Sequence, residues 1–337
     1  DVVVATTGWR PLLVYGNDGH LDFIYTHHAR LSKSFLLLLN DVGIGRALLE
    51  KDRFGALAQD RRLPVPTSLA WKGTGPGTVA GNEGPVLVKP RQKSDWHDSP
   101  LHTRLFRDGG KALVFEDGRA AVAHPLVAHY HQDLVFQRFI PGDDSALWSY
   151  HGVADEEGTV LADFIGRKIR TFPPITGEST FIEMAQDDAL QALGRDIAAR
   201  IPLRGVFKMD FKKDSRDDRY YLLEINARFN LWHHLGAANG VNLIRAFYDY
   251  VAKTGAVAVP QAALTKRRWV YLRQDYRAYR ALAVQGKLGF MGWMLSLLGS
   301  RKVYPFFAWG DPRPFISLWM VRLRRARRSA GRALSWI

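Results

Sequence analysis

The 337-residue sequence has no cysteine, few acidic residues for its number of basic ones, and no long apolar run. Without cysteine the chain has no disulfide, no thiolate nucleophile and no Cys-ligated zinc, so any metal site must use oxygen or imidazole ligands. The longest candidate for a membrane span, LGFMGWMLSLLG from Leu288, is too short to cross a bilayer as a helix. The first residues, DVVVATTGWR, lack the basic region and the long apolar segment of a secretory signal. We therefore expect a cytoplasmic protein.

Basic residues exceed acidic ones, and the formal net charge of +14 indicates an anionic partner. The tail MVRLRRARRSAGRALSWI has no acidic residue, and it carries Arg322, Arg324, Arg325, Arg327, Arg328 and Arg332. On a helical projection Leu318, Trp319, Val321 and Leu323 lie near one side, as in a helix at a membrane interface. We expect an anionic surface at the inner membrane or a lipid-linked substrate as the partner. A solvated helix and a nucleic-acid tail are alternatives, although no nucleic-acid-binding motif is present.

The hydrophobic content of 47% and the charged content of 24% are typical of a soluble globular chain of two or three domains. PLLVYG and LDFIY resemble short strands, and residues 34–59 are predicted to be helical. Further strands are predicted at PVLVKP, LVFQRFIPG, GTVLADFIGRKIRTF, GVFKMDF and YYLLEIN, with helices around PLVAHYH and in DDALQALGRDIAARI. This mixture predicts an α+β or α/β architecture.

Polar side chains alternate with apolar ones at the end of the run YYLLEINARFN. In a strand, alternate side chains share a face, so Glu224, Asn226 and Arg228 lie together. The segment GVFKMDF likewise places Lys208 and Asp210 on one face, and we expect the two segments to pair. Two carboxylates and an amide at one place favour a cation between them, and Mg²⁺ prefers such oxygen ligands. The pattern predicts half of a Mg²⁺–nucleotide site, with a solvated edge strand as the alternative.

From about Leu49 to Ala252 the sequence resembles the ATP-grasp superfamily, and in particular its carboxylate–amine ligase branch, which includes D-alanine:D-alanine ligase and D-aspartate ligase. The resemblance is carried by EKDRF, PVLVKP, QRFIPGDD, GVFKMDF and YYLLEIN in that order. It implies an α+β ATP-grasp fold, in which two α+β subdomains clasp ATP.

The resemblance also implies roles for individual residues. Asp210, Glu224 and Asn226 match the ligands of one or two Mg²⁺ ions, for which Mn²⁺ can substitute. Lys51, Lys89 and Lys208 match phosphate contacts, and Lys168 and Arg228 are assigned to stabilising an acyl phosphate. Gln137, Arg138, Phe139 and Ile140 would line the adenine, and Asp144 would contact the ribose.

Two further groups of residues are candidates for the site. In the loop RQKSDWHDSP the phosphate partners would be Lys93, Ser94 and Ser99. His233 and His234 follow the metal-site residues closely and are candidates for contact with the acyl acceptor, with a structural role as the alternative.

The resemblance divides the chain into three regions. Residues 1–48 would form a shortened or truncated N-terminal α/β region. Residues 49–255 would form the ATP-grasp domain, with a subdomain boundary near residues 137–142. Residues 256–337 would form a C-terminal extension with a basic amphipathic helix.

The activity implied is that of an ATP- and Mg²⁺-dependent ligase, which joins a small-molecule or peptide carboxylate to an amine through an acylphosphate. An ATP-grasp kinase, which stops at phosphoryl transfer, would use the same residues. A peripheral membrane protein or nucleic-acid-binding protein with a decayed nucleotide site is the alternative outside catalysis. Nucleic acid is the partner that the sequence favours least.

Overall fold

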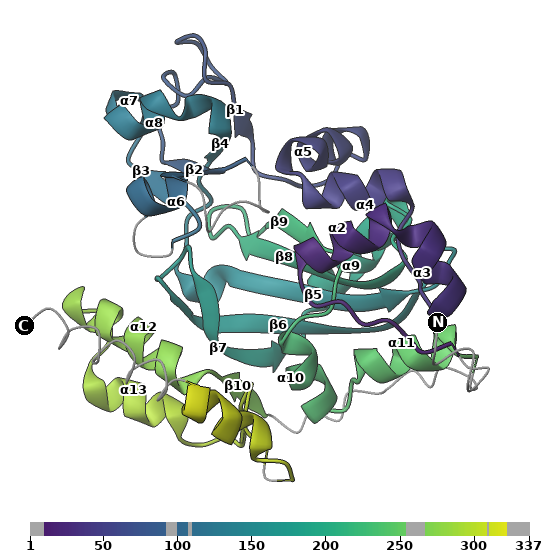
Figure 1. The fold of residues 1–337 in the computed structure, drawn as a ribbon. Coiled ribbons are helices and arrows are strands. Elements are labelled where there is room, and N and C mark those ends of the chain that lie inside the picture. Colours follow the sequence, from purple (N-terminus) through teal and green to yellow (C-terminus); the bar gives the residue numbers. More distant parts are fainter. Residues whose placement is uncertain (1–9, 92–99, 107–109, 254–266, 309, 322–337) are drawn as a thin grey trace, which may run out of the picture.

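The computed structural model describes residues 10–91, 100–106, 110–253, 267–308 and 310–321. This part of the chain contains a four-stranded and a seven-stranded β-sheet, with helices packed around both (Figure 1). Strands and helices are not arranged in repeating parallel units, and nearly all neighbouring strands run antiparallel. The predicted α+β fold is confirmed.

The N-terminal region is helical where the structure describes it. Asn17 and Asp41 accept backbone hydrogen bonds at two helix starts, as side chains at these cap positions commonly do. The prediction of a strand at LDFIY was wrong, because Leu21, Ile24 and Tyr25 point to the core from one face of a helix. PLLVYG forms only an isolated bridge, between Leu12 and Leu36. The helices are α2 (Asp18–Thr26), α3 (His28–Ser34), α4 (Val42–Leu49) and α5 (Lys51–Asp60).

The four-stranded sheet has the order β1-β4-β2-β3, formed by β1 (Ser68–Leu69), β4 (Leu134–Arg138), β2 (Val86–Pro90) and β3 (Leu113–Phe115). Around it lie α6 (Pro100–Arg104), α7 (Gly118–Ala123), α8 (Pro125–His129) and the 3₁₀ turn η1 (His131–Asp133). Val86 and Val88 are fully buried in a core with Ala121 and Val127. Side chains alternate along a strand, so Lys89 faces the opposite side of the sheet.

The seven-stranded sheet has the order β11-β10-β7-β6-β5-β8-β9. Phe207, Met209 and Phe211 on one face of β8 join a core with α9 and α11, and Lys208 and Asp210 therefore face the other way. The central elements are the 3₁₀ turn η2 (Asp144–Ala146), β5 (Leu147–Ala154), β6 (Val160–Phe172), β7 (Glu178–Ala185), α9 (Asp188–Arg200), β8 (Gly205–Lys213), β9 (Tyr220–Asn226), α10 (Trp232–Ala238) and α11 (Leu243–Val251).

The C-terminal region continues the same sheet and does not form a separate appendage. Arg268–Val270 (β10) pairs with β7, and Lys302–Val303 (β11) pairs with β10 in the one parallel pairing found between named strands of the described chain. Between them lie α12 (Leu272–Val284) and α13 (Phe290–Leu297). Asp275 on α12 receives two hydrogen bonds of 2.8 Å from the Arg170 guanidinium on β6, and both side chains are buried.

The predicted basic helix at the end of the chain is only partly described. Residues 313–321 are helical, and the arginines from Arg322 to Arg332 lie outside the described residues, as does Leu323. Across the described ranges, no helix combines the length and the apolar character that crossing a bilayer requires.

Candidate active site

The β8–β9 hairpin brings the predicted metal ligands together. Asp210 lies opposite Glu224, and Lys208 lies opposite Asn226, in antiparallel register. The predicted pairing of GVFKMDF with YYLLEIN is therefore confirmed. All four side chains line one large cleft between the two sheets, of about 1930 Å³.

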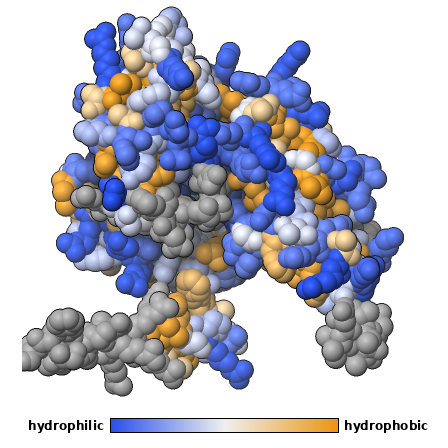
Figure 2. Space-filling model, turned by 45° about the horizontal axis from the view of Figure 1, so that its top comes forward, coloured by the Kyte–Doolittle hydropathy of each residue, from blue (hydrophilic) through white to orange (hydrophobic). Residues whose placement is uncertain are grey.

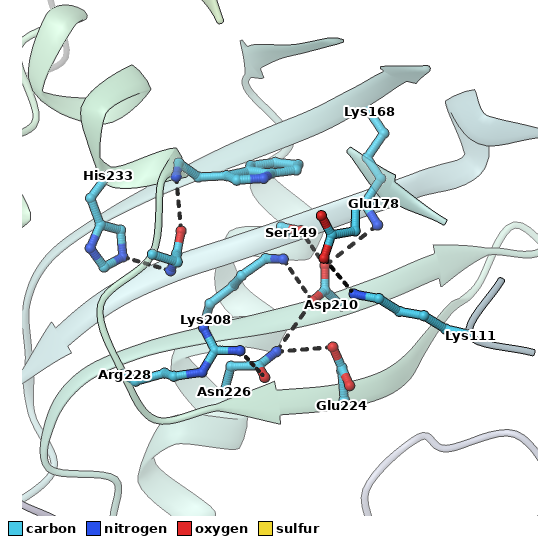
Figure 3. Close-up of polar contacts among 12 residues, drawn as sticks. Lys111, Ser149, Lys168, Glu178, Lys208, Asp210, Glu224, Asn226, Arg228 and His233 are labelled. Carbon is cyan, nitrogen blue, oxygen red and sulfur yellow. Dashed lines mark hydrogen bonds and ion pairs between the residues drawn. The ribbon is translucent and has the colours of Figure 1, made fainter. Parts of the chain in front are cut away.

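Asp210 is the centre of the polar network (Figure 3). Its carboxylate accepts a 2.6 Å hydrogen bond from Ser149 Oγ on β5 and lies 2.8 Å from Lys208 Nζ. Lys168 Nζ on β6 lies 4.0 Å from the same carboxylate. Because Asp210 is only 6% exposed, these two ammonium groups offset the unfavourable burial of its charge.

Glu224 and Asn226 complete an oxygen-rich group beside Asp210. The Asn226 amide donates to Glu224 Oε1 at 3.0 Å and, at 3.5 Å, to Asp210 Oδ2. No three His, Cys, Asp or Glu side chains within the described chain are grouped so as to hold a metal ion. The two carboxylates nevertheless fit a hard divalent cation, which completes its shell with water or phosphate oxygens, and rotation of the Asn226 amide would add its oxygen to the ligands.

Arg228 links this group to the N-terminal helices. Its Nε donates to Asp18 Oδ1 of α2 at 2.7 Å, and its Nη2 donates to Asn226 Oδ1 at 3.4 Å. The guanidinium thus lies at the rim of the metal-site candidates and lines the cleft. The importance of Asp18 was not anticipated, because it is 210 residues from Arg228 in the sequence.

The two predicted lysines beside Asp210 have different surroundings. Burial lowers the pKa of Lys168, and the neighbouring Asp210 opposes that shift. Lys208 Nζ lies 4.9 Å from the centre of the Trp232 ring, so that it contacts both an aromatic face and a carboxylate. Each lysine is positioned by a strand of the sheet, which limits where its charge can lie.

The opposite wall of the cleft contains the predicted nucleotide contacts. Lys51 is the first residue of α5, as predicted, and its Nζ donates to the carbonyl of Pro90. Lys89 lines the cleft from β2. The cleft is also lined, at the end of β4, by the predicted adenine contacts Gln137, Arg138, Phe139 and Ile140. The structure thus brings these residues into the same cleft as the metal-site candidates.

Asp144 has partners that do not fit its predicted contact with the ribose. It is 7% exposed and does not line the cleft. Its carboxylate accepts hydrogen bonds from Thr171 N, Thr171 Oγ1 and Ile175 N, at 2.6 to 2.7 Å. Burial raises the pKa of Asp144, and these hydrogen bonds oppose the shift. We therefore interpret Asp144 as an anchor for the segment after β6 and omit it from the nucleotide contacts.

Lys212 lines the cleft but was not anticipated from the sequence. It follows Lys208 and Asp210 at the same two-residue spacing on β8. Because residues two apart on a strand share a face, this spacing could have predicted that Lys212 faces the cleft. Its Nζ lies 4.3 Å from the centre of the Phe139 ring, at the predicted adenine wall. Burial lowers the pKa of Lys212 to about 8, although Asp144 and Asp143 oppose the shift.

The two histidines after the hairpin do not line the cleft. His233 is 1% exposed and shares a 3.0 Å hydrogen bond with the Asn230 side chain. Burial lowers the pKa of His233 to about 3, so the ring is neutral at pH 7. His234 is exposed. This geometry favours the structural interpretation.

The loop candidates Lys93, Ser94 and Ser99 lie outside the described residues.

Comparisons with known proteins bear on the fold and on the class of protein. No protein-family model matches the chain. The D-aspartate ligase of Enterococcus faecium (strain Aus0004) is 25% identical over 246 residues, which are 69% of this chain and 57% of that protein. The chain therefore spans less than two thirds of the length of this relative.

Solved structures with a similar fold include two carboxylase enzymes. A biotin carboxylase–beta-gamma-ATP complex from Campylobacter jejuni has a TM-score of 0.57 at 12% identity, over 77% of this chain and 58% of that one. A biotin carboxylase domain of Hydrogenobacter thermophilus 2-oxoglutarate carboxylase, in complex with MgADP, has a TM-score of 0.52 at 14% identity, over 74% and 55% of the two chains. The predicted ATP-grasp fold is confirmed, as is the resemblance to the carboxylate–amine ligases.

Proposed function

We propose that this ATP-grasp chain is an ATP- and Mg²⁺-dependent ligase that joins a carboxylate to an amine. The observation that carries the proposal is the position of Asp210 opposite Glu224, with Lys168 and Lys208 beside Asp210, in a cleft between two sheets. The similarity to D-aspartate ligase supports the class of reaction.

Asp210, Glu224 and Asn226 would hold the metal ion, because they offer oxygen ligands on two adjacent strands. When bound, Mg²⁺ supplies positive charge that offsets the charge of the phosphate oxygens. We also propose that the site can hold a second Mg²⁺ ion and that Mn²⁺ can replace Mg²⁺.

The nucleotide would lie between the two sheets. Lys51, Lys89 and Lys208 would contact phosphate oxygens, and Gln137, Arg138, Phe139 and Ile140 would line the adenine. We add Lys212 to this set because its ammonium lies against the Phe139 ring inside the cleft.

The reaction would occur in two steps. A carboxylate oxygen of the first substrate attacks the γ-phosphorus of ATP, the bond to ADP breaks, and an acylphosphate forms. The amine then attacks the acyl carbon, phosphate leaves with the bonding electrons, and the amine loses a proton. Lys168 and Arg228 would stabilise the negative charge that moves onto the acylphosphate oxygens, since both cations line the cleft beside the metal ligands.

The substrates would be small molecules or short peptides. A cleft of about 1930 Å³ is larger than the usual volume of roughly 300–1,000 Å³ for a site that holds one small ligand. Space therefore remains for an acceptor beside a nucleotide.

The test is a measurement of ADP release from ATP and Mg²⁺ in the presence of pooled amino acids and peptides, with the product mass determined. A product with the combined mass of acid and amine less one water is expected. A phosphorylated product would instead support a kinase, and the absence of ADP release with every pool would contradict both assignments.

A further inference from the structure

The net positive charge of this protein comes from its C-terminal region. Residues 266–337 contain 16 Lys and Arg and 2 Asp, so their formal charge of +14 equals that of the whole chain. Residues 1–265 are therefore neutral overall. One of the two acids, Asp275, is fully buried and paired with Arg170, which leaves Asp311 as the exposed acid of the described part of this region.

Helix α13, in the same region, exposes large apolar side chains and buries no residue completely. Met291 is 67% exposed, Leu295 60% and Leu298 61%. We define the α13 face as Phe290, Met291, Met294, Leu295 and Leu298, all of which are exposed. The helical residues 313–321 expose a further set, Phe315, Ile316, Trp319, Met320 and Val321. Figure 2 shows part of the exposed apolar surface in orange at the lower edge of the molecule.

The α13 face is held in a fixed orientation. Trp293 on α13 donates from Nε1 to the buried carboxylate of Asp275 at 2.8 Å, and its ring stacks on Tyr279 of α12 at 5.1 Å. Because Asp275 is also bound to Arg170 of β6, these contacts connect α13 to the central sheet. The apolar side chains thus point outward from a helix that is anchored to the core.

Helix α12 connects this surface to the cleft. Gln274, Arg277 and Ala281 on α12 line the cleft, and α12 also packs against α13 through Tyr279. A partner on the α13 face would therefore lie close to one end of the cleft. Arg273 and Arg280 on the neighbouring helix α12, and Lys287 in the connection before α13, are exposed basic residues.

We propose that the α13 face docks onto an anionic lipid bilayer. Exposed Phe, Met and Leu side chains on a helix whose adjoining segments carry exposed Lys and Arg match an interfacial helix, which buries apolar residues among acyl chains and attracts anionic headgroups. A nucleic acid would match the charge but would leave the aliphatic side chains in water. The docking is independent of the proposed ligase activity and places one end of the cleft at the membrane surface.

The experiment is co-sedimentation of the full chain with vesicles of phosphatidylglycerol and phosphatidylcholine in equal parts, and with vesicles of phosphatidylcholine alone. The test variant carries Met291→Gln and Leu295→Gln, which remove apolar area without changing the charge. The matched control carries Phe23→Gln and Val42→Gln, at exposed apolar positions on α2 and α4. Unfolding midpoints of both variants establish that the fold is retained.

We expect the wild-type chain and the control to bind the anionic vesicles. The affinity of the test variant for the same vesicles should be at least about tenfold lower. Binding to phosphatidylcholine alone should be weaker for all three, and salt should reduce binding to the anionic vesicles. Equal binding by the test variant and the wild type would overturn the proposal. So would failure of the wild type to bind, or its binding to duplex DNA or RNA with the same dependence on Met291 and Leu295.

Discussion

Asp210 on β8 lies directly opposite Glu224 on β9, although the chain makes a six-residue excursion between the two strands. This register places two carboxylates on the cleft side of the sheet, where Lys168 and Lys208 flank Asp210. A slip of one residue would turn one carboxylate toward the core. The buried Phe207, Met209 and Phe211 on the opposite face of β8 therefore help to fix the candidate metal site.

Replacement of Phe139 by Ala tests the adenine wall. The ring lines the cleft and lies against Lys212 Nζ, so its loss should raise the dissociation constant of ATP about tenfold. Substitution by Asp would be a weaker test, since Lys212 would pair with the new charge. Calorimetric titration with ATP measures the effect. Phe115→Ala, on the edge strand β3 away from the cleft lining, is the control, and an equal loss of affinity in both variants would argue against this placement.

Lys212 predicts that nucleotide binding depends on pH. Its pKa of about 8 means that the ammonium is present at pH 7 and is largely lost at pH 9. If this charge attracts the nucleotide, affinity for ATP should fall about fivefold between these pH values, which corresponds to ~1 kcal/mol. The fall should disappear in Lys212→Met and persist in Lys213→Met, whose side chain pairs with Asp218. A fall of the same size in Lys212→Met would exclude Lys212 as its source.

Two buried histidines predict that the protein loses stability in acid. His151 is fully buried, stacks on Phe164 at 4.4 Å, and has no hydrogen-bond partner for either ring nitrogen within the described structure. Burial lowers the pKa of His151 well below its usual range and that of His233 to about 3. Below about pH 6.5 the unfolded chain therefore binds more protons than the folded chain, and the free energy of unfolding decreases as the pH falls.

Each histidine should contribute about 2 kcal/mol to the difference in unfolding free energy between pH 7 and pH 5. The variant His151→Leu removes one of these two titrating groups. The difference in unfolding free energy between pH 7 and pH 5 should therefore be about 2 kcal/mol smaller than in the wild type, whatever the effect of the substitution at pH 7 itself. Urea denaturation at the two pH values gives the comparison. An unchanged difference would mean that His151 is already charged at pH 7 or that it titrates normally in the folded protein.

The Asp275–Arg170 pair predicts that α12 belongs to the folded core. Asp275→Asn would leave the Arg170 guanidinium buried beside a neutral amide, which should reduce the unfolding free energy by about 3–5 kcal/mol. The exposed Asp311→Asn is the control and should change it by less than about 0.5 kcal/mol. Equal stability of the two variants would show that the C-terminal region unfolds independently.

The hairpin and its polar face could be predicted because strand alternation is a local property. GVFKMDF and YYLLEIN each show the period of two, and one short polar segment joins them. Lys89 at the end of β2 and Lys51 at the start of α5 were also predictable, since apolar runs and helix starts mark such positions.

Other features depend on contacts between distant residues. Asp144 resembles an exposed acid after a turn, and its burial follows from Thr171 and Ile175, which lie 27 and 31 residues further along the chain. The three-residue strand β10 is too short to be recognised by periodicity, and its pairing with β7 was therefore missed. LDFIY was misassigned because its β-forming residues outweighed the helical spacing of Leu21, Ile24 and Tyr25.

The most direct test of the proposed metal–nucleotide site is the rate of ADP release by Glu224→Gln in the presence of ATP, Mg²⁺ and an acceptor. The change removes one negative charge from the site with little change in shape, so the rate should fall at least about a hundredfold while the unfolding midpoint stays the same. Glu157→Gln, at an exposed position between β5 and β6, should retain the wild-type rate. ADP release at the wild-type rate by Glu224→Gln would contradict the assignment of the β8–β9 carboxylates to a metal ion.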